Sequence, residues 1–222
     1  MKPLILNMDT ALPQASICLS QDGVCLDIFK NESQKDHAAW LHPAIEQMLR
    51  KNELGLKDLD GIAVTAGPGS YTGLRISMAA AKGFCFILKK PLLLINTLET
   101  MAYSAIQAIH AGNDTLYCPM IDARRMEVFT AVYNADLNVL VPMAAVVLNE
   151  YFDDSLPSGK KVIVFGSGSL KYQGRHEVLP GIATDASHLA ELATRAFMEK
   201  KFTRLDEAVP LYGKAFFTPP VK

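Results

Sequence analysis

A strand, a glycine-rich turn and a helix follow one another directly in residues 61–88, and this succession constrains the fold more than any other part of the sequence. Residues 61–66 form an apolar run typical of a buried strand. Residues 67–71 contain two glycines and a proline, and residues 72–88 carry the small and apolar residues of a packed helix. Because strands that lead directly into helices are the units of α/β proteins, the sequence predicts an α/β fold.

The rest of the chain fits two variations of one plan. Expected strands of the first half cover residues 4–8, 15–20, 24–29, 61–66 and 91–95, and expected helices cover residues 37–49, 72–88 and 98–109. The second half restarts with strands at residues 115–121, 127–133, 140–147 and 161–165, and a helix follows at residues 187–200. Ser187 is the expected N-cap of that helix. We therefore expect two lobes, residues 1–110 and 111–222, in which strands and helices follow variations of one order, βββαβα.

Composition limits the classes of function. The 22 Lys and Arg residues balance 23 Asp and Glu residues, so no overall positive field attracts a nucleic acid, and any contact with one is local or belongs to a partner. No apolar stretch approaches the roughly 20 residues that span a bilayer. The four cysteines are widely spaced in apolar surroundings, as reduced core thiols are. We expect a cytoplasmic protein without membrane contact.

The loop Gly67–Arg75, with the sequence GPGSYTGLR, is the main candidate for a phosphate site. Glycines free the backbone amides at a helix N-terminus to bind an anion, although the loop lacks the lysine of a Walker A motif. Asp9 and Thr10 end the first strand, where they could orient Mg²⁺ and approach a phosphate. The alternatives are that the glycines only permit a tight turn, that Arg75 covers the helix surface and that Asp9 caps its own turn. The candidate residues are Asp9, Thr10, Gly69, Ser70, Tyr71, Thr72, Gly73 and Arg75.

The spacing of residues gives little support for a metal site, a hydrolase nucleophile or a nucleic-acid patch. His37 and His42 are five residues apart and cannot form the metal pair of an H-E-x-x-H helix. Gly166-Ser167-Gly168 is too short for the nucleophile elbow of a hydrolase. Arg124-Arg125 is interpreted as a solvated turn unless a family supplies a role.

Four segments in the same order resemble the TsaB family. They are residues 5–10, the helix that begins at His37, the loop Gly67–Arg75 and the stretch 121–129 with the sequence IDARRMEVF; Pro210–Lys214 adds a weaker match. The resemblance implies a two-lobed, ribonuclease H-like fold of the actin, Hsp70 and sugar-kinase class, with mixed sheets flanked by helices. It also implies a non-catalytic subunit of tRNA N6-threonylcarbamoyladenosine synthesis that binds and activates a TsaD-type transferase.

The resemblance further implies that the metal of the transferase is absent from this chain. TsaD holds its metal with two histidines spaced H-x-x-x-H, and Thr97 and Met101 stand at those positions here. Pro13 removes one backbone donor from a phosphate cradle. We therefore expect no activity and no bound cofactor in the chain alone, with ATP or ADP and Mg²⁺ near an interface shared with a partner. The alternatives are an ATP-dependent phosphotransferase and a glycoprotease-like hydrolase of the same fold.

Partner contacts are implied for the first two helices, through which TsaB-like proteins pair with TsaD or with themselves. A TsaE-type ATPase is a further implied partner, a homodimer is implied for the isolated chain, and contact with tRNA is indirect. The expected interface residues are His37, Trp40, Leu41, Ala44, Ile45, Met48, Met78, Lys82 and Phe86. The alternative is that Leu41, Ile45 and Met48 are core residues. From Tyr212 onward we expect a loosely held tail, in which Lys214 replaces the usual arginine of the family.

Overall fold

The computed structural model describes residues 2–33, 36–112 and 114–214. Asn113, which belongs to the turn sequence Ala111-Gly112-Asn113-Asp114 after the third expected helix, lies outside these ranges, and so do Pro219-Pro220 of the expected tail. Within them, no helix has the length and apolar character needed to cross a membrane.

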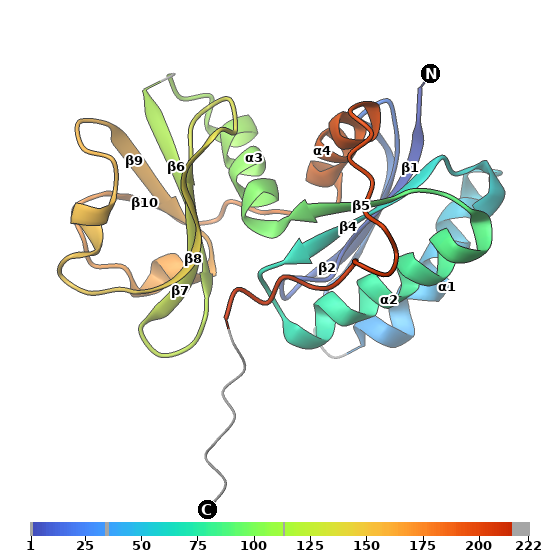
Figure 1. Cartoon of the computed structure of the whole chain (residues 1–222), viewed down its shortest axis with the longest axis horizontal. Helices are drawn as coiled ribbons and strands as arrows, with labels where there is room; N and C mark the ends of the chain where they lie inside the picture. Colours follow the sequence, from blue (N-terminus) through green and yellow to red (C-terminus); the bar gives the residue numbers. More distant parts are fainter. Residues whose placement is uncertain (1, 34–35, 113, 215–222) are drawn as a thin grey trace, which may run out of the picture.

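The first lobe is built on a mixed sheet with the strand order β3-β2-β1-β4-β5 (Figure 1). Its strands are β1 (Leu4–Asp9), β2 (Ala15–Gln21), β3 (Val24–Asn31), β4 (Gly61–Gly67) and β5 (Leu92–Asn96). β1 lies at the centre, antiparallel to β2 and parallel to β4, so that Met8 pairs with Ile17 on one side and with Val64 on the other. The turn after β1 and the loop after β4 therefore leave the sheet at the same edge.

The second lobe repeats this topology. Its sheet has the order β10-β9-β6-β7-β8, formed by β6 (Thr115–Asp122), β7 (Glu127–Tyr133), β8 (Val139–Val147), β9 (Lys161–Phe165) and β10 (Glu177–Leu179). β6 is antiparallel to β7 and parallel to β9, as β1 is to β2 and β4. The predicted fold class, two mixed sheets flanked by helices, is confirmed. The short strand β10 was not predicted, and the 3-10 turns η2 (Phe152–Ser155) and η3 (Ser167–Lys171) stand where the first lobe has longer helices.

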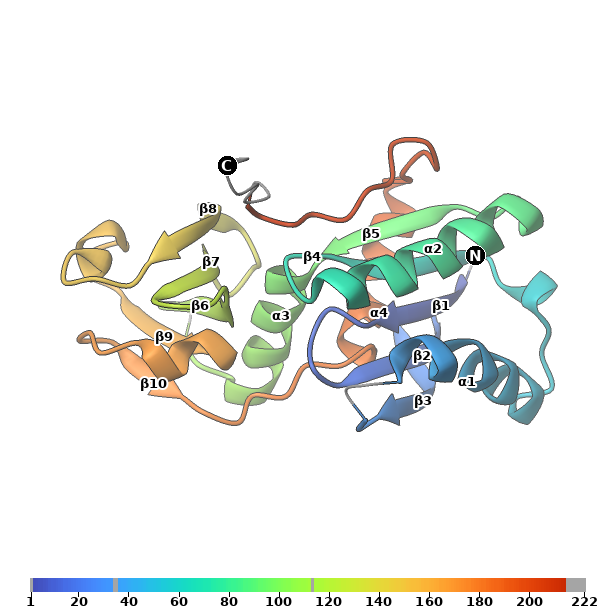
Figure 2. The same cartoon turned by 90° about the horizontal axis from the view of Figure 1, so that it is seen from below.

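Helices cover both faces of the first sheet (Figure 2). α1 (His37–Lys51) and α2 (Tyr71–Leu88) pack on one face, and α4 (Ser187–Met198) packs on the other. The period of two along β1 explains this arrangement, because Leu6 and Met8 point to α1 and α2 whereas Ile5 points to α4. α3 (Thr97–Ile109) packs on the second sheet, between the lobes, and η1 (Leu56–Asp58) follows α1.

The last helix returns to the first lobe, although the sequence division at residues 110 and 111 places it in the second. Ala193 on α4 packs against Ile5, Ala63 and Leu93 of the first sheet. The predicted N-cap is wrong as well. Ser187 is the first residue of the helix, and its backbone N–H donates to the carboxylate of Asp185 at 3.0 Å. Asp and Ser are both common N-cap residues, so the sequence Asp185-Ala186-Ser187 alone does not show which of the two caps the helix.

Residues 203–214, which we call the strap, also run over the first lobe. Thr203 bridges Leu92, and the Leu211 N–H donates to the Ala66 carbonyl at 2.7 Å. At its end, Lys214 forms an ion pair with Glu127 of the second lobe. The strap is therefore attached to both lobes, and the prediction of a loose tail from Tyr212 onward is wrong for residues 212–214.

Candidate functional site

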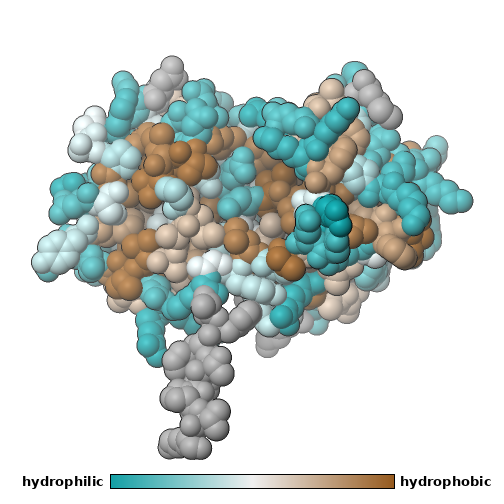
Figure 3. Space-filling model, viewed as in Figure 1, coloured by the Kyte–Doolittle hydropathy of each residue, from teal (hydrophilic) through white to brown (hydrophobic). Residues whose placement is uncertain are grey.

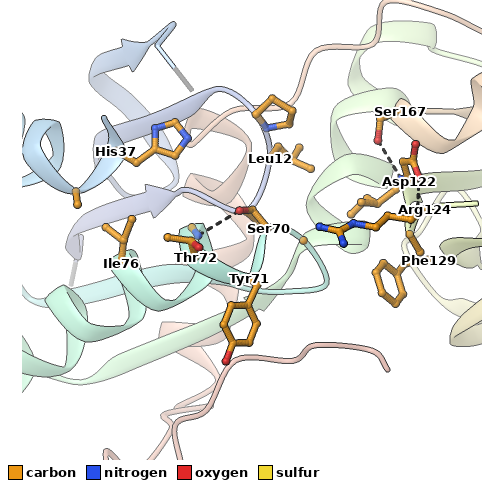
Figure 4. A pocket seen from close by; sticks show the side chains of 17 residues that line it. Leu12, His37, Ser70, Tyr71, Thr72, Ile76, Asp122, Arg124, Phe129 and Ser167 are labelled. Atoms are coloured by element: carbon orange, nitrogen blue, oxygen red, sulfur yellow. Dashed lines mark hydrogen bonds between the residues drawn. The ribbon is translucent and has the colours of Figure 1, made fainter. Parts of the chain in front are cut away.

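A cleft of about 740 Å³ lies between the two lobes (Figure 4). It is formed by the β1–β2 turn, the start of α1, the β4–α2 loop, the β6–β7 turn and the start of η3. The topology brings three of the segments noted in the sequence to one place, because the β1–β2, β4–α2 and β6–β7 connections all open toward the gap. The lining residues are Ala11, Leu12, Pro13, His37, Ala38, Gly69, Ser70, Tyr71, Thr72, Gly73, Ile76, Ile121, Asp122, Ala123, Arg124, Phe129 and Ser167.

The β1–β2 turn and the β4–α2 loop are joined by hydrogen bonds between their backbones and side chains. The Ser70 N–H donates to the Ala11 carbonyl at 2.7 Å, and the Thr10 hydroxyl donates to the Gly73 carbonyl at 2.6 Å. A Cβ atom at Gly73 would overlap the Thr10 carbonyl oxygen, and one at Gly69 would overlap that of Ala11. These two glycines are therefore required for the close approach of two backbones. We call this contact the joint.

Thr10 is part of the joint and Asp9 is buried directly before it in the chain, and neither residue lines the cleft. The Asp9 carboxylate accepts hydrogen bonds from the Ala11 N–H at 3.0 Å and from the Thr65 hydroxyl at 2.8 Å. Its burial raises the pKa of Asp9 to about 6, against the lowering effect of these two donors. Its second oxygen has no partner in the described part of the chain. The bond from Ala11 is the one expected of an aspartate that caps its own turn.

Arg75 faces the strap rather than the cleft. Its guanidinium carbon lies 4.0 Å from the ring centre of Tyr71, and its Nε donates to the Tyr212 hydroxyl at 2.8 Å. The rings of Tyr71 and Tyr212 lie 4.9 Å apart, so the arginine closes a stack of three side chains. The geometry matches the interpretation in which Arg75 covers the surface of its helix.

Among the described residues, Arg124 is the Lys or Arg side chain that lines the cleft, and it was not among the predicted site residues. It extends from the β6–β7 turn toward Ser70 on the other lobe (Figure 4). Its N–H donates to the Asp122 carboxylate at 2.6 Å, and Asp122 also pairs with Lys171, which holds the pKa of Asp122 below its usual value. The sequence contained a signal for this turn, because the carboxylate of an aspartate can accept a hydrogen bond from the backbone N–H two residues later, and Asp122 stands two residues before Arg124.

The two positions that the family resemblance assigns to the histidines of the transferase belong to α3. Thr97 and Met101 are both buried, and Met101 belongs to the cluster that joins α3 to the second sheet. In residues 2–33, 36–112 and 114–214, no three His, Cys, Asp or Glu side chains are placed to hold a metal ion together. Cys18, Cys85 and Cys118 are buried free thiols, and Cys25 is half-buried.

The predicted partner face divides into core and surface. Five of its residues belong to the core between the first sheet and its helices: Leu41, Ala44, Ile45, Met48 and Met78. Trp40 is half-buried against that core, and His37 is buried with its Nδ1 3.4 Å from Asn31 Nδ2. Lys82 donates to the Ala208 carbonyl of the strap at 3.0 Å, whereas Phe86 is 65% exposed. An apolar stripe that packs inward explains why the five core residues do not form a surface.

Comparisons with known proteins agree with this architecture. The family model of TsaD, described as tRNA N6-adenosine threonylcarbamoyltransferase, matches residues 27–204. The proteins named tRNA threonylcarbamoyladenosine biosynthesis protein TsaB from Bacillus subtilis and Escherichia coli are each 29% identical to the chain. The matches cover 94% of this chain and 90% and 93% of those proteins, respectively. YeaZ from Pseudomonas aeruginosa superposes with a TM-score of 0.83 at 24% identity, over 95% of this chain and 99% of that one.

The two lobes, their repeated mixed sheets and the cleft between them define a two-lobed α/β protein with helices that flank the sheets. The chain belongs to the TsaD family, and the predicted resemblance to its TsaB members is confirmed.

Proposed function

We propose that this chain takes part in the biosynthesis of tRNA threonylcarbamoyladenosine as a non-catalytic subunit that binds and activates a TsaD-type transferase. The observation that carries the proposal is the similarity to TsaB proteins over nearly the whole chain. A further support is that Thr97 and Met101, which are poor ligands for a divalent metal, occupy the positions of the transferase histidines. A cytoplasmic location follows from this proposal.

The exposed side of α2 is the surface that we propose for the partner. Phe86 and Ile87 are 65% and 76% exposed, and Lys89 lies over the Phe86 ring with 4.9 Å between its Nζ and the ring centre. Hydrophobic surface occurs on both lobes (Figure 3), so exposure alone does not select a docking site. The family resemblance selects α2. A second copy of this chain would compete with the transferase for the same surface.

The proposal includes two further components. A TsaE-type ATPase would act on the pair of subunits, and ATP or ADP with Mg²⁺ would bind near their shared interface. tRNA would contact the transferase, because the net charge of -1 provides no general attraction for a polyanion. A phosphotransferase would need Asp9 and Arg75 at the phosphates, and neither side chain lines the cleft.

Reconstitution of the modification reaction tests the proposal. Purified transferase, a TsaE-type ATPase, tRNA and a source of threonylcarbamoyl adenylate are combined with and without this chain, and the modified nucleoside is measured by mass spectrometry. We expect no transfer by the chain alone and modification only when chain and transferase are both present. Full modification without the chain would contradict the proposal.

A pair of variants tests the surface. Phe86→Glu places a charge in the proposed interface, and we expect its affinity for the transferase to fall at least about tenfold. Leu170→Glu is the matched control, since Leu170 is 84% exposed on the second lobe. Affinity is measured by calorimetry, and equal affinities of the two variants would exclude this side of α2.

A further inference from the structure

The guanidinium of Arg124 differs from nearly every other guanidinium of the protein. Five of the seven arginines have a partner: Arg50 with Glu46, Arg75 with Tyr212, Arg175 with Asp154, Arg195 with Glu191 and Arg204 with Asp206. Across the described ranges, the guanidinium of Arg124 forms no ion pair and no hydrogen bond, and the same holds for Arg125. Of these two, Arg124 lines the cleft and Arg125 does not.

The charge of Arg124 is not cancelled by its surroundings. Among the described residues that line the cleft, Asp122 is the one acidic residue, and its carboxylate is already paired with Lys171 and with the Arg124 N–H. A guanidinium without a carboxylate partner presents a planar fork of donors that matches the two oxygens of a carboxylate or a phosphate.

The backbone holds Arg124 in place before any ligand arrives. Arg124 and Arg125 have φ values of 72° and 50°, in the left-handed region that residues with a side chain seldom adopt. The turn is closed by the Glu127 N–H, which donates to the Arg124 carbonyl at 3.0 Å, and by the Ala123 N–H, which donates to the Glu127 carbonyl at 3.1 Å. Arg124 extends into the cleft (Figure 4), whereas Arg125 is not among the residues that line it.

The remaining walls of the cleft are mostly apolar. Leu12, Ile76 and Phe129 line it together with the hydroxyls of Thr72 and Ser167. The described lining residues provide one guanidinium and no unpaired carboxylate, a set that suits one oxyanion better than a triphosphate with its metal, which requires several cations and an acidic ligand. The volume lies within the range of small-molecule sites.

We infer that the cleft binds a small molecule that carries a single oxyanion, a carboxylate or a phosphate monoester, beside a flat apolar group, and that Arg124 anchors the oxyanion. The choice of ligand rests on the proposed function. Threonylcarbamoyladenosine has this chemistry, because its threonyl carboxylate adjoins a purine. Adenosine monophosphate has it also, with a phosphate in place of the carboxylate.

Three compounds that share adenosine test the inference by calorimetry on the full chain. They are N6-threonylcarbamoyladenosine, adenosine monophosphate and adenosine. We expect at least one of the first two to bind about tenfold to a hundredfold more tightly than adenosine, as charge-assisted hydrogen bonds provide. The stronger of the two identifies the oxyanion as carboxylate or phosphate. Equal binding of all three compounds, or no binding at millimolar concentration, would overturn the inference.

Two neighbouring variants assign the anchor. Arg124→Gln is expected to reduce the affinity for the oxyanion compound to that for adenosine. Arg125→Gln removes the same charge from the same turn and is expected to leave the affinity unchanged. Equal losses in both variants would show general charge attraction and reject Arg124 as the anchor.

This assay and the reconstitution test fail independently. If the compounds do not bind while modification still requires the chain, the inference about the cleft falls and the proposed function stands. If they bind through Arg124 while modification proceeds without the chain, the proposed function falls.

Discussion

The loop Gly67–Arg75 and the turn Asp122–Arg125 lie on opposite sides of the cleft, and they use their polar groups in opposite ways. The loop has the more conspicuous sequence, yet Ser70, Gly73 and Arg75 bond to the β1–β2 turn, to Thr10 and to Tyr212 of the strap. The turn has an ordinary sequence, yet it directs an unpaired guanidinium into the cleft. A glycine-rich loop at a helix N-terminus is therefore not by itself an anion site, because its groups can be used by a neighbouring backbone.

Adding one carbon atom at Gly73 should produce the largest effect on the joint. In Gly73→Ala the new Cβ meets a backbone carbonyl that cannot rotate away, so we expect a loss of at least about 3 kcal/mol in the free energy of unfolding. The measurement is urea denaturation followed by circular dichroism.

The control for this variant lies on the same helix. Gly83 has no atom within 4 Å of the position of a Cβ, so Gly83→Ala should stabilise the protein by about 0.5 to 1 kcal/mol. Arg124→Gln should change stability by less than about 0.5 kcal/mol. A similar loss for Gly73→Ala and Arg124→Gln would remove the distinction between a structural loop and a binding turn.

The next largest effect concerns pH and Asp9. Because burial raises the pKa of Asp9 from 3.8 to about 6, the folded state binds a proton more tightly than the unfolded state. Asp9 therefore contributes to the free energy of unfolding below about pH 4, and this contribution is lost as the pH rises through about 6. The loss amounts to about 3 kcal/mol. Asp9→Asn keeps an oxygen acceptor for Ala11 and removes the titration.

Urea denaturation of wild type and Asp9→Asn at pH 4.5 and pH 7 measures this difference, since all other groups contribute equally to both proteins. The wild type should lose more stability than Asp9→Asn over this interval. Parallel curves for the two proteins would mean that Asp9 is solvated at the edge of the cleft, as the interpretation with Mg²⁺ requires.

The smallest effect should come from Arg75. Arg75→Gln removes the contact with Tyr71 and the bond to Tyr212, so we expect the strap to open about two to five times more often. Hydrogen exchange at the Leu211 amide reports this opening, because that amide is bonded to Ala66. Binding of ligands to the cleft should not change. A loss of binding equal to that of Arg124→Gln would place both arginines in one site.

Most elements of the fold could be predicted, because their signals are local. The strand at residues 127–133 and the strand at residues 161–165 have the predicted bounds, and the other predicted strands and helices differ by one or two residues at an end. Apolar runs, turn residues and glycines act over a few positions, so they can be recognised without knowledge of the tertiary structure.

The features that were missed depend on distant contacts. Nothing in residues 187–198 indicates that α4 packs against β1 rather than β9, since an apolar stripe fits either sheet. The burial of Asp9 depends on Thr65 and on the joint, and the paired state of Arg75 depends on a tyrosine 137 residues away. The direction of Arg124 depends on two left-handed residues that no local preference requires.

The position of α4 has a consequence for folding during translation. Strands β1, β4 and β5 emerge early, but the face that carries Ile5, Ala63 and Leu93 stays uncovered until residues 187–198 have been made. All strands of the second sheet lie in the chain between β5 and α4, so this sheet can form before α4 has been synthesised. The lobe that is synthesised first is therefore completed last, and its open apolar face is the surface that a chaperone would have to protect during translation.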